Sequence, residues 1–481
     1  MSTIQVQNFI NGEFCDSERH LDSFDPSTGE VWAKIPDSSA NDVEQAVKAA
    51  KDAFVGWSDT PVQERSKILL KIADILEQRL DEVAEIESKD QGKPLWLAKT
   101  VDIPRAVYNF RFFATSALHD LNRSSQMQAV DAFNYTIKMP VGVAGLISPW
   151  NLPLYLLSFK LAPALIAGNT VVAKPSEMTS VSAWKLAEIF VSAGLPAGVI
   201  NLVFGTGPTA GECIVKHPDV PIVSFTGGTV TATKLRIAAA PFSKKLSLEL
   251  GGKNPGVIFN DTDLDKCIPT TVRSSFMNQG EICLCTSRLY VQRDIYQTFV
   301  DRFVTEVKKL VVGPYRSEGV FMGPLISKEH LAKVKGYVEL ARKEGATILC
   351  GDEDLNLSDA NKNGYFMRPT VIVDIKDTSR CMTEEIFGPV VCIVLFDTID
   401  EVIQRANSVK YGLSATVWTS NVTTLHKVSH KLHAGTVWAN CWLVRDLNMP
   451  FGGMKESGTG RESAKDSLEF FTEEKTICVK L

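Results

Sequence analysis

Short apolar runs alternate with helical stretches through the middle of this chain, and the alternation limits the folds that it can adopt. The runs are five to eight residues long, and helical patterns such as Ser182–Ala193 separate them. Buried strands of this length, joined by helices, are typical of βαβ units with a parallel sheet covered on both faces. We therefore predict an α/β fold that binds ligands beyond the carboxyl ends of its strands. The predicted strands are Val141–Ser148, Thr170–Lys174, Val199–Phe204, Ile222–Gly227, Lys245–Leu250 and Pro255–Phe259.

A second alternation in the C-terminal half predicts a second α/β domain. Two amphipathic helices, Asp42–Phe54 and Glu64–Ile86, precede the first alternation. A domain usually has about 100–200 residues, so two or three domains fit a chain of 481 residues. The later strands lie near Ser287–Gln292, Phe366–Asp374, Val390–Phe396 and Val437–Asn440, and the later helices near Ile295–Leu310, Lys328–Glu344 and Thr398–Ala406.

Two segments fit neither predicted core. Asn122–Lys138 is polar around a short alternating stretch, and Thr476–Leu481 has the pattern of a lone C-terminal strand. Because an unpaired strand edge promotes aggregation, we expect both segments to pair between subunits. The predicted assembly is a homodimer or a homotetramer.

The composition excludes several classes of partner. Lys plus Arg number 51 against 56 for Asp plus Glu, and no long block of one sign occurs, so we expect no nucleic acid partner. The most apolar stretch, Leu161–Ala173, is interrupted by Pro163 and Gly168 and is shorter than the roughly 18 apolar residues of a membrane span. Neither a targeting signal nor paired cysteine spacing is visible. A cytoplasmic protein without membrane contact is therefore expected.

Glycine-rich turns follow two of the predicted strands. Gly205–Gly211 resembles a dinucleotide fingerprint, but Pro208 and Ala210 depart from the usual spacing, and a tight turn explains the run equally well. Phe225–Thr229 also lies at a strand end, where small residues let a ligand approach the backbone. Together the two turns favour a nucleotide site. Its candidate residues here are Gly207, Phe225, Gly227 and Gly228.

Other strand ends and loops carry groups suited to catalysis. Cys283 and Cys285 offer thiols, although two buried structural cysteines are the alternative interpretation. Glu249 ends an apolar run, so its carboxylate is either paired or has a raised pKa suited to a general base. Asn151 follows a buried strand and can donate to an oxyanion. No metal site is predicted, since the helically spaced histidines lack an accompanying cysteine or acid pattern. These are His426, His430 and His433.

Taken in order, these motifs resemble those of the aldehyde dehydrogenase superfamily along nearly the whole chain. The resemblance implies that Cys283 is the nucleophile, Glu249 the general base and Asn151 the side-chain donor to the oxyanion, while Cys285 has no family role. The implied reaction adds the thiolate to an aldehyde, passes hydride to NAD and hydrolyses the resulting thioester with water.

The resemblance also implies a cofactor site and a division into domains. Glu177 favours NAD over NADP, because a carboxylate repels a 2′-phosphate. Further cofactor residues implied by the resemblance are Ile147, Ser148, Trp150, Lys174, Glu385 and Phe387. The implied architecture has a Rossmann-like parallel-sheet NAD-binding domain (1–121 and 142–251), an α/β catalytic domain (252–456) and a small β oligomerisation extension (122–141 and 457–481).

Three positions depart from the family pattern. Gly228 replaces a serine that helps to hold the pyrophosphate, and Ala232 replaces a frequent glycine at the start of the next helix. Backbone N–H groups at that helix end would remain available. Glu281 replaces a glutamine two residues before Cys283, where an anion would disfavour the thiolate or supply a second acid or base.

Two arginines fall at positions that line the substrate tunnel in the superfamily. Arg105 and Arg445 suit a carboxylate, whereas surface or ion-pair roles are the alternative interpretation. We therefore predict an acidic semialdehyde as the substrate. The local sequence is similar to the branch that oxidises muconic semialdehydes, which implies 2-aminomuconic 6-semialdehyde of tryptophan breakdown by the kynurenine route. 2-Hydroxymuconic semialdehyde and retinal are alternatives, as are transfer of the thioester to coenzyme A and a non-catalytic structural or binding role.

Overall fold

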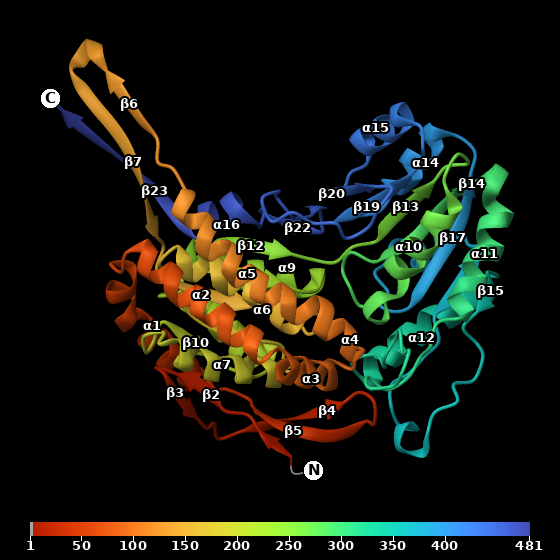
Figure 1. Ribbon diagram of the computed structural model, residues 1–481, viewed down its shortest axis with the longest axis horizontal. Coiled ribbons are helices and arrows are strands. Elements are labelled where there is room, and N and C mark those ends of the chain that lie inside the picture. Colours follow the sequence, from red (N-terminus) through yellow and green to blue (C-terminus); the bar gives the residue numbers. More distant parts are fainter. Residues whose placement is uncertain (1–2) are drawn as a thin grey trace.

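Two large sheets, each covered by helices, form the frame of the molecule (Figure 1). The computed structural model describes residues 3–481. The first sheet has eight strands in the order β22-β12-β11-β8-β9-β10-β2-β3. Its parallel strands are β8 (Val143–Ile147), β9 (Thr170–Lys174), β10 (Ile200–Leu202), β11 (Ile222–Thr226) and β12 (Lys245–Glu249). Its antiparallel strands are β2 (Asn8–Ile10), β3 (Glu13–Cys15) and β22 (Gly458–Thr459).

The second sheet has seven strands in the order β15-β16-β17-β14-β13-β19-β20. All neighbouring strands run parallel except the edge strand β15 (Thr347–Cys350). The two parallel cores confirm the predicted α/β class. The parallel strands are β13 (Asn254–Ile258), β14 (Thr286–Gln292), β16 (Thr370–Val373), β17 (Val390–Phe396), β19 (Ser414–Trp418) and β20 (Thr436–Ala439).

Helices pack on both faces of the first sheet. Neighbouring residues of β8 show this, because Leu146 joins one apolar core and Ile147 joins another. One core involves α2 (Val62–Gln78), α5 (Ile103–Ser116), α6 (Pro153–Ile166) and α7 (Val181–Ala193), and the other α1 (Ala40–Ser58), α8 (Glu212–Lys216) and α9 (Thr229–Ala239). The second sheet carries α10 (Leu264–Phe276), α11 (Tyr296–Lys308), α12 (Lys328–Lys343), α14 (Ile399–Ala406) and α15 (Val422–Lys431). Within residues 3–481, no helix combines the length and apolar character of a membrane span.

The predicted helix Glu64–Ile86 is wrong in one respect, because it consists of two helices. The chain leaves helical geometry at Arg79 (φ −100°, ψ 17°), between α2 and α3 (Leu80–Gln91). The guanidinium of Arg79 bonds to Glu82 on α3 and to Glu188 on α7, and these contacts hold the break. The apolar period continues across the break, which is why the sequence pattern did not reveal it.

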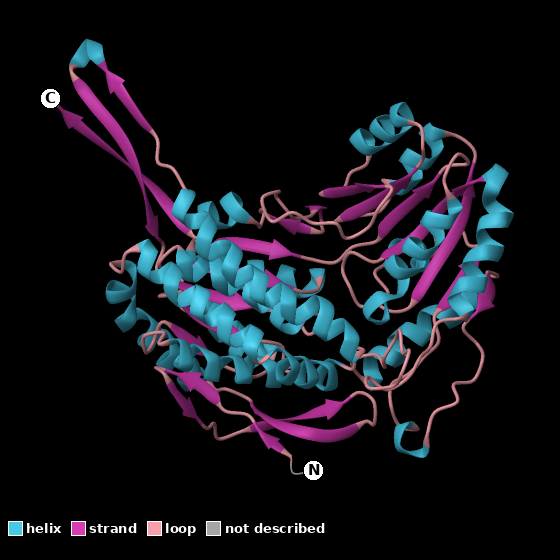
Figure 2. Cartoon of the chain, in the orientation of Figure 1, coloured by secondary structure: helices cyan, strands magenta, loops and turns pink. Residues whose placement is uncertain are grey.

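We call the eight-stranded sheet with its helices the first body and the seven-stranded sheet with its helices the second body. A three-stranded sheet extends from the first body as an arm (Figure 1 and Figure 2). β7 (Ala132–Pro140) pairs antiparallel with β23 (Thr472–Lys480) over nine residue pairs, and β6 (Ser124–Met127) lies on the other side of β7. The C-terminal strand is therefore not a lone strand. The two segments pair with each other within one chain, which the sequence did not predict; their pairing between subunits stays a prediction. The outer edges of β6 and β23 stay open.

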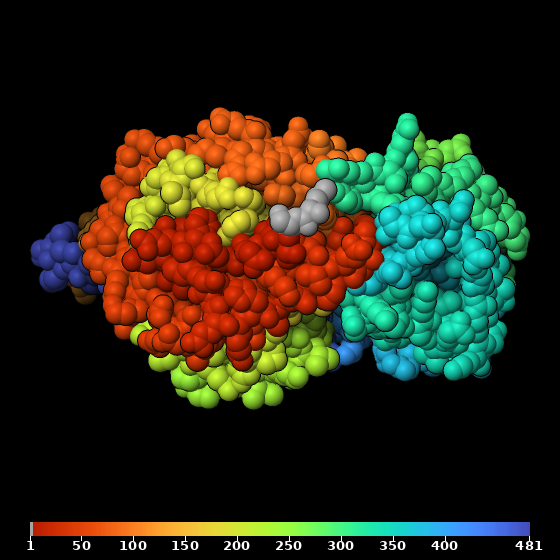
Figure 3. All heavy atoms as spheres, turned by 90° about the horizontal axis from the view of Figure 1, so that it is seen from below, coloured from red at the N-terminus to blue at the C-terminus, as the bar shows by residue number. Residues whose placement is uncertain are grey.

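The N-terminal strands pack beneath the first body and reach the second (Figure 3). β1 (Ile4–Gln5), β5 (Glu30–Pro36) and β4 (His20–Asp25) form a small sheet that sequence patterns did not predict. The turn between β4 and β5 contacts the second body, because Tyr365 N donates to Pro26 O (3.0 Å) and Asn361 Nδ2 donates to Ser27 O (2.8 Å). The domain boundaries proposed from sequence remain a proposal, and within 457–481 the strand β22 joins the first sheet.

Candidate active site

The carboxyl ends of the parallel strands bring several predicted residues to one edge of the first sheet. In the register of the sheet, Ile147 lies beside Lys174 on one side and beside Phe225 on the other. Glu249 ends the next strand and lies beside Thr226. Ser148, Trp150 and Asn151 follow directly after β8. The edge that the βαβ pattern predicts thus carries residues that the sequence assigns to catalysis and to cofactor binding.

Cys283 lies in the loop between α10 and β14, where an unusual backbone turns it toward this edge. Asn278 and Gln279 have φ of 51° and 58°, and Gly280 has φ of 70°. A Cβ atom at Gly280 would lie 2.3 Å from the carbonyl oxygen of Gly388, so only glycine fits there. The thiol of Cys283 is half-buried, whereas Cys285 is buried.

The Asn151 amide is held beside the nucleophile loop. Its Nδ2 donates to the carbonyl oxygen of Glu281 at 2.8 Å, two residues before Cys283. The backbone carbonyl oxygen of Asn151 accepts from Lys93 Nζ (3.1 Å) and from Asn278 Nδ2 (3.1 Å). One N–H of the amide is thereby fixed, which leaves the second for an oxyanion. Lys93 is fully buried and also pairs with Asp102.

Glu249 is a buried carboxyl group without a hydrogen bond at Oε1. Burial and the nearby Glu462 carboxylate raise the pKa of Glu249 well above its usual range, while Lys160 and Arg445 oppose the rise. Lys160 Nζ donates to Ser224 Oγ (2.8 Å) and pairs with Glu462 Oε1 (3.0 Å). Of the two states that the sequence allowed for this acid, burial without an ion pair among residues 3–481 favours the one with a raised pKa.

The surroundings of Cys283, the predicted nucleophile, favour its thiol form. Burial, and then the carboxylates of Glu249 and Glu385, raise the pKa of Cys283 above its usual range, while Arg445 lowers it. The thiolate therefore forms only when a base removes the proton or when the charges around Cys283 change. Burial also raises the pKa of Cys285, to about 12, so the pKa does not separate the two thiols, and Cys285 differs in being buried.

Glu281 faces a buried polar cluster. Its Oε1 accepts from the Ile326 N–H (3.2 Å), and its Oε2 accepts from Gln91 Nε2 (3.0 Å). His330 Nε2 lies 3.6 Å from Oε1. Burial raises the pKa of Glu281 well above its usual range, which favours the neutral acid. The Glu281 carboxyl group thus helps to hold the loop that carries Cys283. The sequence had left the role of Glu281 open.

Lys174 and Glu177 occupy the position that the sequence assigns to an adenosine ribose. The buried Lys174 Nζ donates to Gly205 O (2.8 Å) and to Pro175 O (3.0 Å) and pairs with Glu177 Oε2 (3.2 Å). The Glu177 carboxylate is about one third exposed (36%) and can accept from hydroxyl groups. Gly207 begins a short helical turn that follows β10.

The start of α9 offers an open anion site. Gly228 precedes the helix, and a Cβ atom there would meet no atom within 4 Å. A Cβ atom at Gly227 would lie 2.4 Å from the ring of Phe225, so glycine is required at that position. The first N–H groups of this eleven-residue helix, together with its dipole, suit a phosphate group. Loss of the family's serine at position 228 therefore leaves space and backbone donors.

Glu385 and Phe387 lie near Cys283, and Trp150 packs on Phe387. Glu385 Oε1 accepts from the Gly252 N–H at 2.9 Å. The rings of Trp150 and Phe387 pack edge to face with centroids 5.3 Å apart. Phe387 has φ of 59°, and its carbonyl oxygen contacts His330 Nε2 at 2.6 Å. Glu385, Phe387 and Cys283 line one small pocket. That Glu385 and Phe387 hold a nicotinamide ribose stays a prediction.

Arg105 on α5 and Arg445 in the loop after β20 converge on Tyr155 of α6. The Arg105 guanidinium lies 5.3 Å from the Tyr155 ring centroid, and Arg445 Nη1 lies 3.5 Å from the Tyr155 hydroxyl. Each guanidinium has one buried Nη2 atom without a hydrogen-bond partner. Burial lowers the pKa of Arg105, and the neighbouring Arg445 lowers it further. The two cations therefore form a pair that an anionic ligand can complete.

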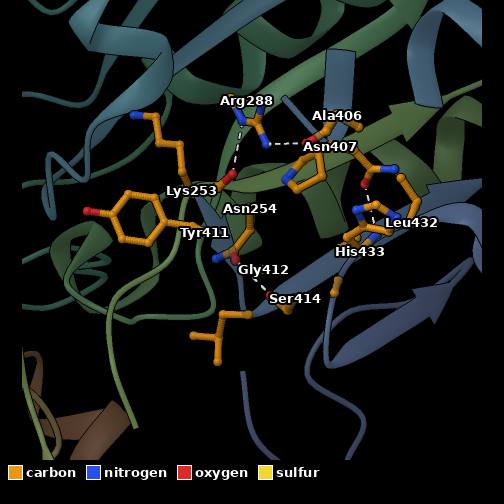
Figure 4. A pocket seen from close by; sticks show the side chains of 14 residues that line it. Lys253, Asn254, Arg288, Ala406, Asn407, Tyr411, Gly412, Ser414, Leu432 and His433 are labelled. Carbon is orange, nitrogen blue, oxygen red and sulfur yellow. Dashed lines mark hydrogen bonds between the residues drawn. The ribbon is translucent and has the colours of Figure 1, made fainter. Parts of the chain in front are cut away.

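A separate cavity lies in the second body (Figure 4). Arg288 Nε donates to the Lys253 carbonyl oxygen (2.9 Å), and Arg288 Nη2 donates to Ala406 O (2.9 Å). The Lys253 amine points away from these groups (Figure 4). The cavity contains none of the predicted site residues, and its arginine is bonded to backbone.

The site and the fold together define the class of this protein. The chain belongs to the aldehyde dehydrogenase family, whose sequence model matches residues 14–477. It is 60% identical over 479 residues to 2-aminomuconic semialdehyde dehydrogenase of Bos taurus, covering 99% of this chain and 98% of that protein. It is 44% identical to 2-hydroxymuconic semialdehyde dehydrogenase of a Pseudomonas species, covering 99% of this chain and 100% of that protein. The solved NAD⁺ complex of a Bacillus cereus aldehyde dehydrogenase matches with a TM-score of 0.96 and 40% identity, covering 99% and 97% of the two chains.

Proposed function

We propose that this enzyme oxidises an acidic semialdehyde, most specifically 2-aminomuconic 6-semialdehyde of the kynurenine route, to the carboxylate with NAD. The observation that carries the proposal is the pair of guanidinium groups of Arg105 and Arg445, each with an unpartnered buried nitrogen. We call this arginine pair the anion receptor. Arg445 lowers the pKa of Cys283 and of Glu249, so its guanidinium lies near the reacting groups. The names of the similar dehydrogenases, which cite muconic semialdehydes, support the same substrate class.

The chain's own residues account for the covalent steps. The proton of Cys283 passes to solvent and the thiolate adds to the aldehyde carbon, while the free N–H of Asn151 and the Cys283 backbone N–H stabilise the oxyanion. When bound, NAD supplies the hydride acceptor that turns this thiohemiacetal into a thioester. Glu249 then takes a proton from water, which attacks the thioester and releases the acid. The raised pKa of Glu249 makes its carboxylate a stronger base than that of an exposed glutamate.

The cofactor residues fit a dinucleotide with an unmodified ribose. Glu177 would accept hydrogen bonds from the adenosine ribose beside Lys174, and the open start of α9 at Gly228 would receive the pyrophosphate. Glu385 and Phe387 would hold the nicotinamide end. The carboxylate at position 177 would repel the 2′-phosphate of NADP.

A second candidate substrate is 2-hydroxymuconic semialdehyde. It carries the same carboxylate, and the Pseudomonas relative named for it is 44% identical. Retinal lacks a carboxylate, so the arginine pair disfavours it. Glu249 supplies the base for hydrolysis, which argues against transfer to coenzyme A.

The test is a panel of aldehydes assayed for NADH production without coenzyme A. We expect kcat/KM for the two muconic semialdehydes to exceed that for hexanal and retinal at least about tenfold, since a charge-assisted contact is worth about 1.5–3 kcal/mol. NADP should support much less activity than NAD. Equal kcat/KM for acidic and uncharged aldehydes would contradict the acidic substrate, and strict dependence on coenzyme A would contradict hydrolysis.

The same proposal includes an assembly and a location. The open edges of β6 and β23 on the arm support a homodimer or a homotetramer. The ten cysteines are free thiols, including the nucleophile, which suits a reducing compartment such as the cytoplasm.

A further inference from the structure

The two guanidinium groups of the anion receptor are held in place by neutral groups. Across residues 3–481, neither Arg105 nor Arg445 lies within ion-pair distance of a carboxylate. Arg445 instead lies over the ring of Phe451, with its guanidinium carbon 3.8 Å from the ring centroid, and 5.3 Å from that of Phe159. Two like charges in a partly buried site repel each other, so other contacts must fix their positions.

Asn109 provides the first of these contacts. It lies one turn after Arg105 on α5 and is fully buried. Its Oδ1 accepts from Arg105 Nε at 3.2 Å, and its Nδ2 donates to Tyr155 O (3.0 Å) and Ser158 Oγ (3.0 Å) on α6. The Asn109 side chain thus uses its polar groups to orient Arg105 and to join it to the helix that carries Tyr155.

Tyr155 provides the second contact, because it touches both cations. The face of its buried ring lies beside the Arg105 guanidinium, and its hydroxyl oxygen is an acceptor for Arg445 Nη1. A ring and a hydroxyl attract a guanidinium without removing its charge. An aspartate or glutamate in either place would neutralise the receptor and compete with a carboxylate ligand.

We propose that Asn109 and Tyr155 are positioning residues that determine specificity for acidic aldehydes: they hold Arg105 and Arg445 together and leave the positive charge for the substrate carboxylate. The inference rests on the proposed function. It adds that discrimination between acidic and neutral aldehydes depends on two uncharged residues as well as on the arginines.

The decisive variant is Asn109→Asp, which keeps the shape of the side chain and places a carboxylate on Arg105. We expect kcat/KM for 2-hydroxymuconic semialdehyde to fall at least about tenfold, mainly through a higher KM, because the new acid occupies the guanidinium. For hexanal, kcat/KM should stay within about twofold, since no carboxylate is bound. Tyr155→Phe keeps the ring and removes only the hydroxyl, so a smaller loss of about threefold is expected for the acidic substrate alone.

Tyr108→Phe is the matched control. Tyr108 is exposed on the same helix, and its ring lies 5.5 Å from the Arg105 guanidinium, a contact that phenylalanine keeps. Within residues 3–481 its hydroxyl bonds to neither arginine, so the ratio of acidic to neutral activity should not change. Thermal unfolding of each variant checks the fold, and if Asn109→Asp does not fold, Tyr155→Phe decides. Equal losses on both substrates by folded variants, or an unchanged ratio, would overturn the inference. If the wild type itself shows no preference for acidic aldehydes, the proposed function fails as well, whereas a preference that survives both substitutions overturns only this inference.

Discussion

At the scale of single residues, two neighbouring cysteines of the site have different surroundings. Cys283 and Cys285 are two residues apart, yet one is half-buried beside Glu249 and Glu385, and the other is buried in an apolar cluster. The cysteine pattern alone predicts two thiols. The greater exposure of Cys283 favours it as the reactive thiol.

The roles of the two thiols can be separated by substitution. Cys283→Ala should abolish NADH production while NAD binding persists, because the nucleophile is lost and the proposed cofactor residues are intact. Cys285→Ala should keep most of its activity. Steady-state assays together with titration of NAD by fluorescence measure both quantities, and normal turnover by Cys283→Ala would rule out the mechanism.

Glu249→Gln tests the base. The nucleophile and the hydride acceptor remain, so one burst of NADH should be followed by accumulation of the acyl-enzyme, which intact-mass measurement detects. In the wild type, release of the acid should accelerate as pH rises through the raised pKa of Glu249, above the usual range of a glutamate. The variant should lack this acceleration. A variant that turns over normally without an adduct contradicts the assignment.

Substitution of either arginine should affect acidic aldehydes and uncharged aldehydes differently. Arg105→Ala or Arg445→Ala should reduce kcat/KM for muconic semialdehydes about tenfold to a hundredfold, because each removes a charge-assisted contact of about 1.5–3 kcal/mol. Short uncharged aldehydes should be oxidised about as well as by the wild type. Equal losses on both kinds of aldehyde would assign a structural role to the arginines.

At the scale of secondary structure elements, the sequence predicts best where one apolar period marks one element. The strands β8, β9, β11 and β12 were predictable because each is a short apolar run that ends at glycine or a polar residue, and these ends carry Asn151, Lys174 and Glu249. α6 was not predicted, because it is apolar on all sides and therefore has no amphipathic period. Lys160, Glu462, Lys93 and His330 were missed for another reason: they reach the site from distant parts of the chain, and no local motif marks them.

Asp90 links several elements, and its buried carboxyl group should make the stability of the folded state depend on pH. Its buried carboxyl accepts from Trp32 on β5 (3.1 Å) and from the Val181 N–H at the start of α7 (2.9 Å). Burial raises the pKa of Asp90 to about 7. Because the folded state binds this proton more tightly than the unfolded state, the group's contribution to stability falls as pH rises from about 4 to about 7 and is constant above that.

Asp90→Asn should remove this dependence. The melting temperature of the variant relative to the wild type should therefore be higher at pH 8 than at pH 5. Asp301→Asn, at an exposed position on α11, is the control and should show no such trend. A difference between variant and wild type that is the same at both pH values would contradict the interpretation.

At the scale of the whole molecule, the arm is the predicted contact between subunits. Phe133 and Val479 expose apolar side chains on β7 and β23. Light scattering at micromolar concentration should report a dimer or a tetramer for the wild type. Phe133→Lys combined with Val479→Lys should shift the assembly toward the monomer, while Val191→Lys on α7 should not, and a monomeric wild type would refute the proposal.

The pairing of β22 with β12 and of β23 with β7 also constrains how this chain is made. Both C-terminal strands lie within residues 458–480, whereas their partners lie at 245–249 and 132–140. A ribosome releases the N-terminal partners long before it has synthesised the strands that complete their sheets. During translation one edge of β12 and one edge of β7 therefore stay unpaired until β22 and β23 have been synthesised. Contacts of such long sequence separation also form slowly. Residues 458–480 are thus needed to complete two sheets whose other strands are synthesised earlier.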